Sequence, residues 1–147
     1  MTDAQLLGVM RDIFIASKND IFHDGADSAF SLKLMAYMTA HKIEAISIIE
    51  TIIFNEQVSD NVISEALRWV GKFEDKETHL ARRDLLERSL NLVSPIAKDG
   101  AILGLSFMDD PNAISALEHA LENENLKSVK DDIQQVLDQL YETRQGS

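Results

Sequence analysis

The segment PIAKDGAILGLSFMDDP, residues 95–111, decides which fold this chain can adopt. Apolar residues fall on every side of it, two glycines interrupt it, and Lys98 and Asp99 lie near its start. Glycines and a charged pair weaken a strand, and a membrane-spanning helix needs a run of about 18 to 20 apolar residues. We therefore predict a helix that packs against other helices on several of its sides.

Helical spacing assigns the sides of this segment. One side carries Ala97, Ala101, Leu105 and Met108, and nearly the opposite side carries Ile96, Leu103 and Phe107. Gly100 and Gly104 lie beside this second side, four positions apart, so another helix can approach closely there. We expect only a narrow exposed strip, made of Lys98, Asp99, Ser106 and Ile102.

Composition excludes several classes of partner. The 147 residues include 14 Lys and Arg but 25 Asp and Glu, which gives a formal charge of −11. Such a charge argues against nucleic acid, because cations on phosphates supply most of that affinity, and against anionic membranes. The charge serves solubility, or it matches a basic partner protein.

Three further observations indicate a cytoplasmic protein. The chain has no cysteine, which excludes a disulfide framework and thiolate chemistry and suits a reducing compartment. Its start, MTDAQLLGVMRDIF, has acidic residues where a signal peptide needs basic ones. No run of apolar residues approaches the length of a membrane span.

The rest of the chain divides into helices and short breaks. Periodicity predicts helices over residues 3–16 and 29–41, with a polar loop at 17–28. Ser94 before Pro95 and Asp110 before Pro111 are typical helix starts, because the proline then occupies the first helical position.

From residue 42 onward the pattern repeats. Helix pairs are predicted over residues 42–73, 77–108 and 110–142. AIS at 45–47 recurs at 113–115, and EALRWVG at 65–71 aligns with GAILGLS at 100–106. A two-helix repeat of about 34 residues is typical of an α-solenoid.

This pattern resembles HEAT-like repeats, as in bacterial HEAT-repeat proteins. The segments that carry the resemblance are DDPNAISALEHALENENLKSVKDDIQQVLDQL at 109–140 and SPIAKDGAILGL at 94–105. It implies an all-α, right-handed solenoid of about three to four antiparallel helix pairs in a single domain, 1–147. Residues 1–41 would be a divergent N-terminal pair or cap, 42–142 three repeat-like pairs, and 143–147 a tail.

Motifs for catalysis or metal binding do not stand out. The four histidines lie far apart in sequence, and no zinc-ligand spacing, phosphate loop or nucleophile motif occurs. The turn HDGAD at 23–27 is interpreted as a polar turn rather than a metal site. The single tryptophan, Trp69, is interpreted as a core residue, with an anchor at an interface as the alternative. We expect no enzyme activity and no cofactor.

Two charged clusters are interpreted as solvated surface. The acidic residues around the last inter-helix turn are expected at an exposed helix end, with a docking patch for basic residues as the alternative: Glu118, Glu122, Glu124, Asp131 and Asp132. The segment THLARRDLLERSL, residues 78–90, is expected to form exposed i,i+4 pairs such as Asp84 with Arg88, and a local pair explains Arg83.

The resemblance also implies a binding surface, because the second helices of such repeats line a concave, partner-binding side. The candidate partner-binding residues are Glu65, Arg68, Lys72, Lys98, Asp99, Lys130 and Gln134. We therefore expect a non-enzymatic protein–protein interaction module whose partner can be basic. Two alternatives stay open: an immunity or antagonist protein that neutralises a basic toxin, and a HEAT-like lyase or small-ligand-handling protein.

Overall fold

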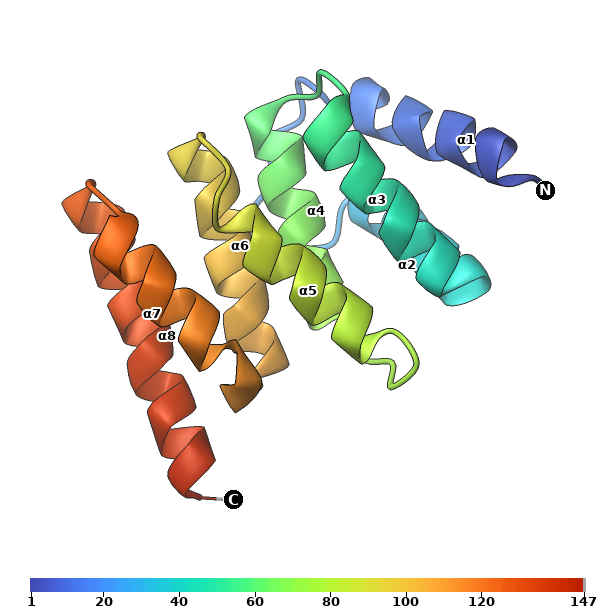
Figure 1. Ribbon diagram of the computed structural model, residues 1–147. Helices are drawn as coiled ribbons and strands as arrows, with labels where there is room; N and C mark the ends of the chain where they lie inside the picture. Colours follow the sequence, from blue (N-terminus) through green and yellow to red (C-terminus); the bar gives the residue numbers. More distant parts are fainter. Residues whose placement is uncertain (147) are drawn as a thin grey trace.

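A computed structural model of the protein describes residues 1–146 (Figure 1). Within that range the chain forms α-helices joined by short connections, one 3-10 turn and no strand, so the predicted all-α class is confirmed. The elements are α1 Asp3–Ala16, α2 Ala29–His41, α3 Ile43–Asn55, α4 Asp60–Lys72, α5 His79–Ser89, α6 Pro95–Met108, η1 Pro111–Ala113, α7 Ile114–Asn123 and α8 Lys127–Gln145.

Local capping explains where the helices begin. The Ser94 hydroxyl accepts a hydrogen bond from the backbone N–H of Ala97, and Pro95 takes the first position of α6. Asp110 caps in the same way but opens the 3-10 turn η1, which leads into α7. α6 ends at Asp109, whose left-handed φ of 49° stops the helix.

The helices of the second half lie in two layers. α4 packs along α6, and α6 packs along α8, while α3 contacts α5. In Figure 1, α3, α5 and α7 lie in front of α4, α6 and α8. α1 and α2 pack against α3, and α2 also reaches α4, so the N-terminal helices share the core with the rest of the chain. Phe14 and Phe30 join them edge to face, with ring centroids 5.0 Å apart.

The contact between α4 and α6 is the most extensive of the helix–helix contacts. A Cβ added at Gly100 would lie 2.6 Å from the Cα of Ser64, and one at Gly104 would lie 2.7 Å from the carbonyl oxygen of Leu67. The prediction that another helix comes close to these two glycines is therefore confirmed.

The expected packing of α6 is wrong on the neighbouring side. Ile96, Leu103 and Phe107 are exposed to 49%, 40% and 44%, although packing was predicted for them, while Ile102, predicted in the exposed strip, is 3% exposed. α4 approaches through the glycines, and the three large side chains lie about 60° further around α6, beyond the edge of α4. Ile102 instead lines a groove between α6 and α8.

The C-terminal helix runs further than predicted. α8 continues to Gln145, through residues expected as a tail, and Thr143 in that extension donates a hydrogen bond to Asp109. Ser147, the last residue of the predicted tail, lies outside the described residues. Among the helices of residues 1–146, none combines the length and apolar character that crossing a bilayer requires.

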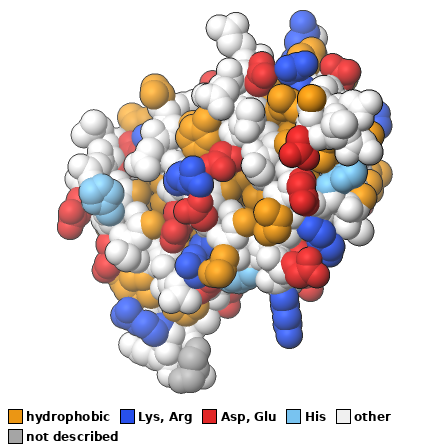
Figure 2. All heavy atoms as spheres, turned by 45° about the vertical axis from the view of Figure 1, so that its right-hand side comes forward, with side chains coloured by type: hydrophobic (Ala, Val, Ile, Leu, Met, Phe, Trp, Pro, Cys, Tyr) orange, Lys and Arg blue, Asp and Glu red, His pale blue; other side chains and the backbone are white. Residues whose placement is uncertain are grey.

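The surface carries both signs of charge. On the face drawn in Figure 2, acidic and basic side chains are interspersed with hydrophobic ones. Some charged side chains form ion pairs between different elements, for example Arg11 with Glu56 and Lys42 with Asp75.

Candidate interaction surface

A row of large apolar side chains runs along the solvent-exposed side of α6. We call Ile96, Leu103 and Phe107 the α6 stripe. They lie seven and four positions apart, a spacing that places them on one side of a helix. The row is about 16 Å long at the rise of an α-helix. Adjacent exposed apolar side chains are typical of binding surfaces, whereas isolated ones are ordinary.

Each residue of the α6 stripe borders a hollow. Ile96 borders one of about 240 Å³ that is also lined by Ile21 and Phe22 of the 17–28 loop. Leu103 borders a groove of about 320 Å³ between α6 and α8. Phe107 borders a cavity of about 670 Å³ at the C-terminal ends of α4 and α6. The stripe therefore forms the apolar element shared by three depressions.

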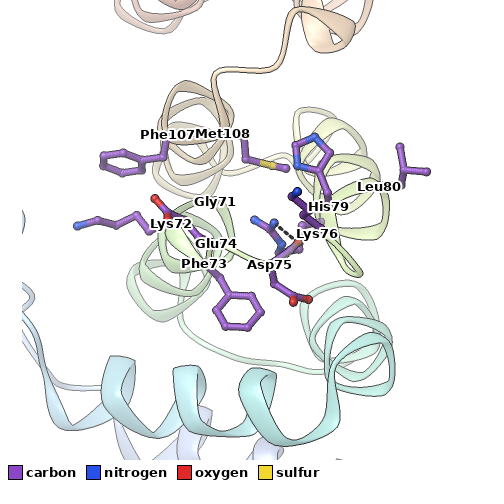
Figure 3. Close-up of a pocket in the computed structure, with 11 residues that line it drawn as sticks. Gly71, Lys72, Phe73, Glu74, Asp75, Lys76, His79, Leu80, Phe107 and Met108 are labelled. Atoms are coloured by element: carbon purple, nitrogen blue, oxygen red, sulfur yellow. Dashed lines mark hydrogen bonds between the residues drawn. The ribbon is translucent and has the colours of Figure 1, made fainter.

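The cavity beside Phe107 lies between the end of α4, the 73–78 connection, the start of α5 and the end of α6 (Figure 3). Lys72 and Phe107 extend to the same side in that view, and Met108 points toward His79. The Lys72 ammonium lies 5.0 Å from the centroid of the Phe107 ring and 4.4 Å from that of Trp69. Cation–π attraction thus holds Lys72 between the two rings.

Asp75 and Arg82 fix the conformation of the 73–78 connection, which lines one side of this cavity. The Asp75 carboxylate pairs with Lys42 at 2.9 Å and accepts hydrogen bonds from Thr78, and these contacts, with Lys42 first, lower the pKa of Asp75. The buried Arg82 donates to Thr78 Oγ1 and to the carbonyl oxygens of Val70 and Asp75. Arg82 is thus an internal support, and its predicted place on an exposed surface is wrong.

The groove between α6 and α8 carries two carboxylates. Asp99 on α6 and Asp132 on α8 line it together with apolar side chains and two glutamines: Ile102, Leu103, Val136, Gln135 and Gln139. Partial burial, together with a hydrogen bond to Asp132 and its charge, raises the pKa of Asp99 to about 6. Neither carboxylate has an ion-pair partner among residues 1–146.

Glu65 and Arg68, two of the predicted binding residues, are instead buried. Arg68 Nη2 lies 2.7 Å from Glu65 Oε1, and Trp69 Nε1 donates to the other Glu65 oxygen at 3.2 Å. Arg68 Nη1 also donates to Asp24 of the 17–28 loop. Trp69 is buried, so its interpretation as a core residue is confirmed. The pair is an internal link between α4 and the loop, not an exposed contact.

Lys98 is also engaged internally. Its ammonium pairs with Glu124 at 2.8 Å. Glu124 further accepts hydrogen bonds from the backbone N–H groups of Asn125 and Leu126, and Lys98 is the main cause that lowers its pKa. The expectation that Glu124 lies on a solvated helix end is therefore wrong, because it is nine-tenths buried and fixes the turn between α7 and α8.

Arg83 has a longer-range partner than predicted. Its Nη1 donates to Asp110 Oδ2 at 2.8 Å, whereas the local partner Glu87 is 3.9 Å away. His79 Nε2 contacts the same Asp110 oxygen at 2.8 Å. The expected exposed pair of Asp84 with Arg88 is confirmed.

The predicted binding residues do not lie on one ridge. Lys130 and Gln134 are each two positions from Asp132 on α8, so they lie about 160° around the helix axis from the groove. Lys72 lies at the Phe107 end of the α6 stripe, and Asp99 lies in the groove beside Leu103.

Sequence reasoning placed Asp132 in the acidic cluster of the last inter-helix turn but missed that it lines a groove together with Asp99, and it missed the exposure of the α6 stripe. The repeat itself offered a signal for Asp132, because it lies 33 positions after Asp99, close to the proposed repeat length. Nothing in the sequence indicated the exposure of the stripe, because this exposure depends on how much of the surface of α6 is covered by α4.

Comparisons with protein-family models, with curated proteins and with solved structures find no significant match to the chain. Among residues 1–146, no group of three or more His, Asp or Glu side chains is placed to hold a metal ion.

Proposed function

We propose that this protein is a non-enzymatic protein–protein interaction module that binds a partner through the α4–α6–α8 layer. The observation that carries the proposal is the α6 stripe, in which three large apolar side chains lie in a row and are each 40% or more exposed. Exposed anchors next to depressions are the usual core of a protein interface, where pockets receive the partner's side chains.

A right-handed, HEAT-like solenoid is the architecture that we propose for this layer. Contacts between residues 33 positions apart support it: Gly71 with Gly104, Lys42 with Asp75, Asp99 with Asp132, and Ser106 with Gln139. Repeated stacking of one helix pair on the next produces such a constant spacing. The α4–α6–α8 layer would then be the concave side.

The acidic charge of −11 supports a basic partner, because complementary charge speeds association. A more specific version is an antagonist that covers a basic toxin. The cytoplasm is the compartment that we propose, in keeping with a cysteine-free chain.

Site-specific photo-crosslinking tests the interaction face. A photoreactive phenylalanine analogue replaces Phe107 in one sample and Phe54 of α3 in the other, because the two side chains are similarly exposed, 44% and 42%. Both proteins are irradiated in an extract of the cells that produce the protein. We expect a protein adduct at position 107 that is absent at position 54. The proposal fails if neither position yields an adduct or if both yield the same ones.

Small-ligand handling is the second candidate, and the cavity beside Phe107 favours it. Its volume of about 670 Å³ lies within the range of ordinary ligand pockets, and it combines aromatic with charged walls. Native mass spectrometry of the protein purified from its own cells tests this candidate. The candidate function predicts an added mass from a bound small compound, and this added mass should be lost when the protein is denatured.

A further inference from the structure

We infer that the groove between α6 and α8 receives a lysine or arginine side chain of the partner protein, which inserts between Asp99 and Asp132 next to the apolar anchor Leu103. This inference rests on the proposed function and adds the chemistry of the partner.

The two ends of the groove differ in how their polar groups are satisfied. At one end, Ser106 donates to the Gln139 side chain at 2.7 Å, and Gln139 donates back to the Ser106 carbonyl at 2.9 Å. Seven positions earlier on each helix, Asp99 and Asp132 bring two carboxylates to the same groove, and no cation of residues 1–146 pairs with either of them. One end is closed by hydrogen bonds, and the other is open to a cation.

Paired carboxylates elsewhere in the protein show what is missing here. Three shielded carboxylates that join two elements each have a cation: Glu124 has Lys98, Asp75 has Lys42, and Asp110 has Arg83. The two lysines closest in sequence to these aspartates do not pair with them. Lys98 is held by Glu124, and Lys130 lies on the far side of α8.

The repulsion between the two carboxylates has a measurable consequence. It contributes to the raised pKa of Asp99, so a proton partly substitutes for the missing cation below about pH 6. Above that pH, a cationic side chain placed between the carboxylates relieves the repulsion and gains charge-assisted hydrogen bonds.

The shape and lining of the groove suit a long basic side chain. Ile102, Leu103 and Val136 line the same volume of about 320 Å³ as the carboxylates. Lysine and arginine carry an apolar stem and a charged head, which matches this combination. A divalent metal ion fits less well, because Mg²⁺ or Ca²⁺ takes six or more oxygen ligands and Ser106 and Gln139 are already bonded to each other.

A second copy of the chain is a poorer occupant, because two molecules of charge −11 repel. Leu103 belongs both to the groove and to the α6 stripe. A partner segment that covers the stripe with apolar side chains therefore places its neighbouring residue at the carboxylates. The fitting segment combines one basic residue with adjacent aliphatic or aromatic anchors.

Selection from a peptide library tests the inference. A random library of 16-residue peptides displayed on phage is selected against the purified protein, and enriched peptides are synthesised for binding by fluorescence anisotropy. We expect the enriched sequences to share a lysine or arginine flanked by apolar residues. The double variant Asp99→Asn/Asp132→Asn should bind them at least tenfold more weakly.

A matched variant separates the groove from overall charge. Asp131→Asn/Asp138→Asn also removes two negative charges, both from exposed positions of α8 outside the groove, and should weaken binding by less than threefold. Replacing the peptide's basic residue with norleucine should weaken binding to the wild type but leave binding to Asp99→Asn/Asp132→Asn unchanged. Equal losses in the two double variants would overturn the inference, as would enriched peptides without a basic residue.

A third variant distinguishes failure of the inference from failure of the proposed function. If Leu103→Ser/Phe107→Ser abolishes peptide binding and Asp99→Asn/Asp132→Asn does not, the α6 stripe is a binding surface and the basic subsite is wrong. If no peptide is enriched, or if binding ignores both sets of changes, both proposals fall. A homodimer that Leu103→Ser dissociates in sedimentation velocity would assign the surface to a second copy and overturn the basic partner.

Discussion

Gly71 on α4 and Gly104 on α6 meet backbone to backbone. A Cβ added to Gly71 would lie 2.6 Å from the carbonyl carbon of Gly104, closer than real Cβ contacts come. No side-chain rotation can relieve such a contact, because the opposing atoms belong to the backbone. The absence of two side chains therefore sets how closely the two helices approach, and with it how far α4 covers α6.

We predict that Gly71→Ala lowers the free energy of unfolding by about 2 to 3 kcal/mol, because the overpacking outweighs the helix-propensity gain of about 1 kcal/mol. Gly8→Ala is the matched control, since Gly8 lies inside α1 with no atom within 4 Å of an added Cβ. It should gain about 0.5 to 1 kcal/mol. Urea denaturation followed by circular dichroism measures both, and equal stabilities would show that α4 and α6 do not touch at Gly71.

Asp110 should stabilise the protein above pH 4 and lose that effect in acid. Burial raises its pKa, but hydrogen bonds from Arg83 and His79 outweigh burial and hold the pKa below the usual range. A depressed pKa in the folded state means a contribution that is complete above the unfolded value, about 3.9, and disappears as the pH falls below it.

The change Asp110→Asn should therefore cost about 2 kcal/mol at pH 7, the worth of hydrogen bonds to a buried charge, and progressively less below pH 4. Asp84→Asn breaks an exposed pair with Arg88 and should cost less than about 0.5 kcal/mol. Denaturation midpoints from pH 2.5 to 7 compare the variants. A loss for Asp110→Asn that persists undiminished at pH 2.5 would contradict the assignment.

Arg68 should matter for stability more than for binding. Replacing it with alanine leaves the carboxylate of Glu65 buried without its cation, which typically costs about 3 to 5 kcal/mol. The other partner, Asp24, is fully exposed, so solvent screens its pair with Arg68, and Asp24→Asn should leave the stability nearly unchanged. Thermal unfolding compares the stabilities of Arg68→Ala and Asp24→Asn. If both variants lose a similar amount of stability, the contact with Asp24 of the loop, and not the pair with Glu65, holds Arg68.

Most of the helical structure was accessible from local sequence. α1 and α2 have the predicted bounds, and serine or aspartate before proline marks two helix starts as expected. Capping and periodicity act over one or two turns, so they can be recognised without knowing the tertiary packing. The same holds for the close approach at Gly100, because small residues permit it whatever the partner helix is.

The candidate surface was less accessible, because it depends on coverage by distant segments. The polar arc of α4 looks exposed in sequence, yet Arg68 lies beneath a loop 44 positions earlier that supplies Asp24. Conversely, Leu103 looks buried, yet it is 40% exposed. Spacing identifies the side of a helix on which a residue lies, but only the packing of other elements decides whether that side meets solvent.

The carboxylate pair in the groove should destabilise the free protein near neutral pH. Because the pKa of Asp99 is raised to about 6, the folded state holds its proton more tightly than the unfolded state between about pH 4 and 6. Stability contributed by this group is therefore present at pH 4, falls as the pH rises to 6, and stays at the lower level above it.

Asp99→Asn removes this loss, so the variant should gain stability over the wild type as the pH rises from 4 to 6. Asp99 is only partly buried, so screening by solvent keeps the gain at pH 7 below about 1 kcal/mol. Asp131→Asn loses an exposed pair with Lys127 and should instead lose a few tenths of a kcal/mol. Guanidinium denaturation at pH 4, 6 and 7 measures both. If Asp99→Asn stabilises the protein and also weakens peptide binding, Asp99 behaves as a binding group, because the charge of such a group is satisfied only by its partner. If Asp99→Asn is less stable than the wild type at pH 7, Asp99 has a partner within the protein.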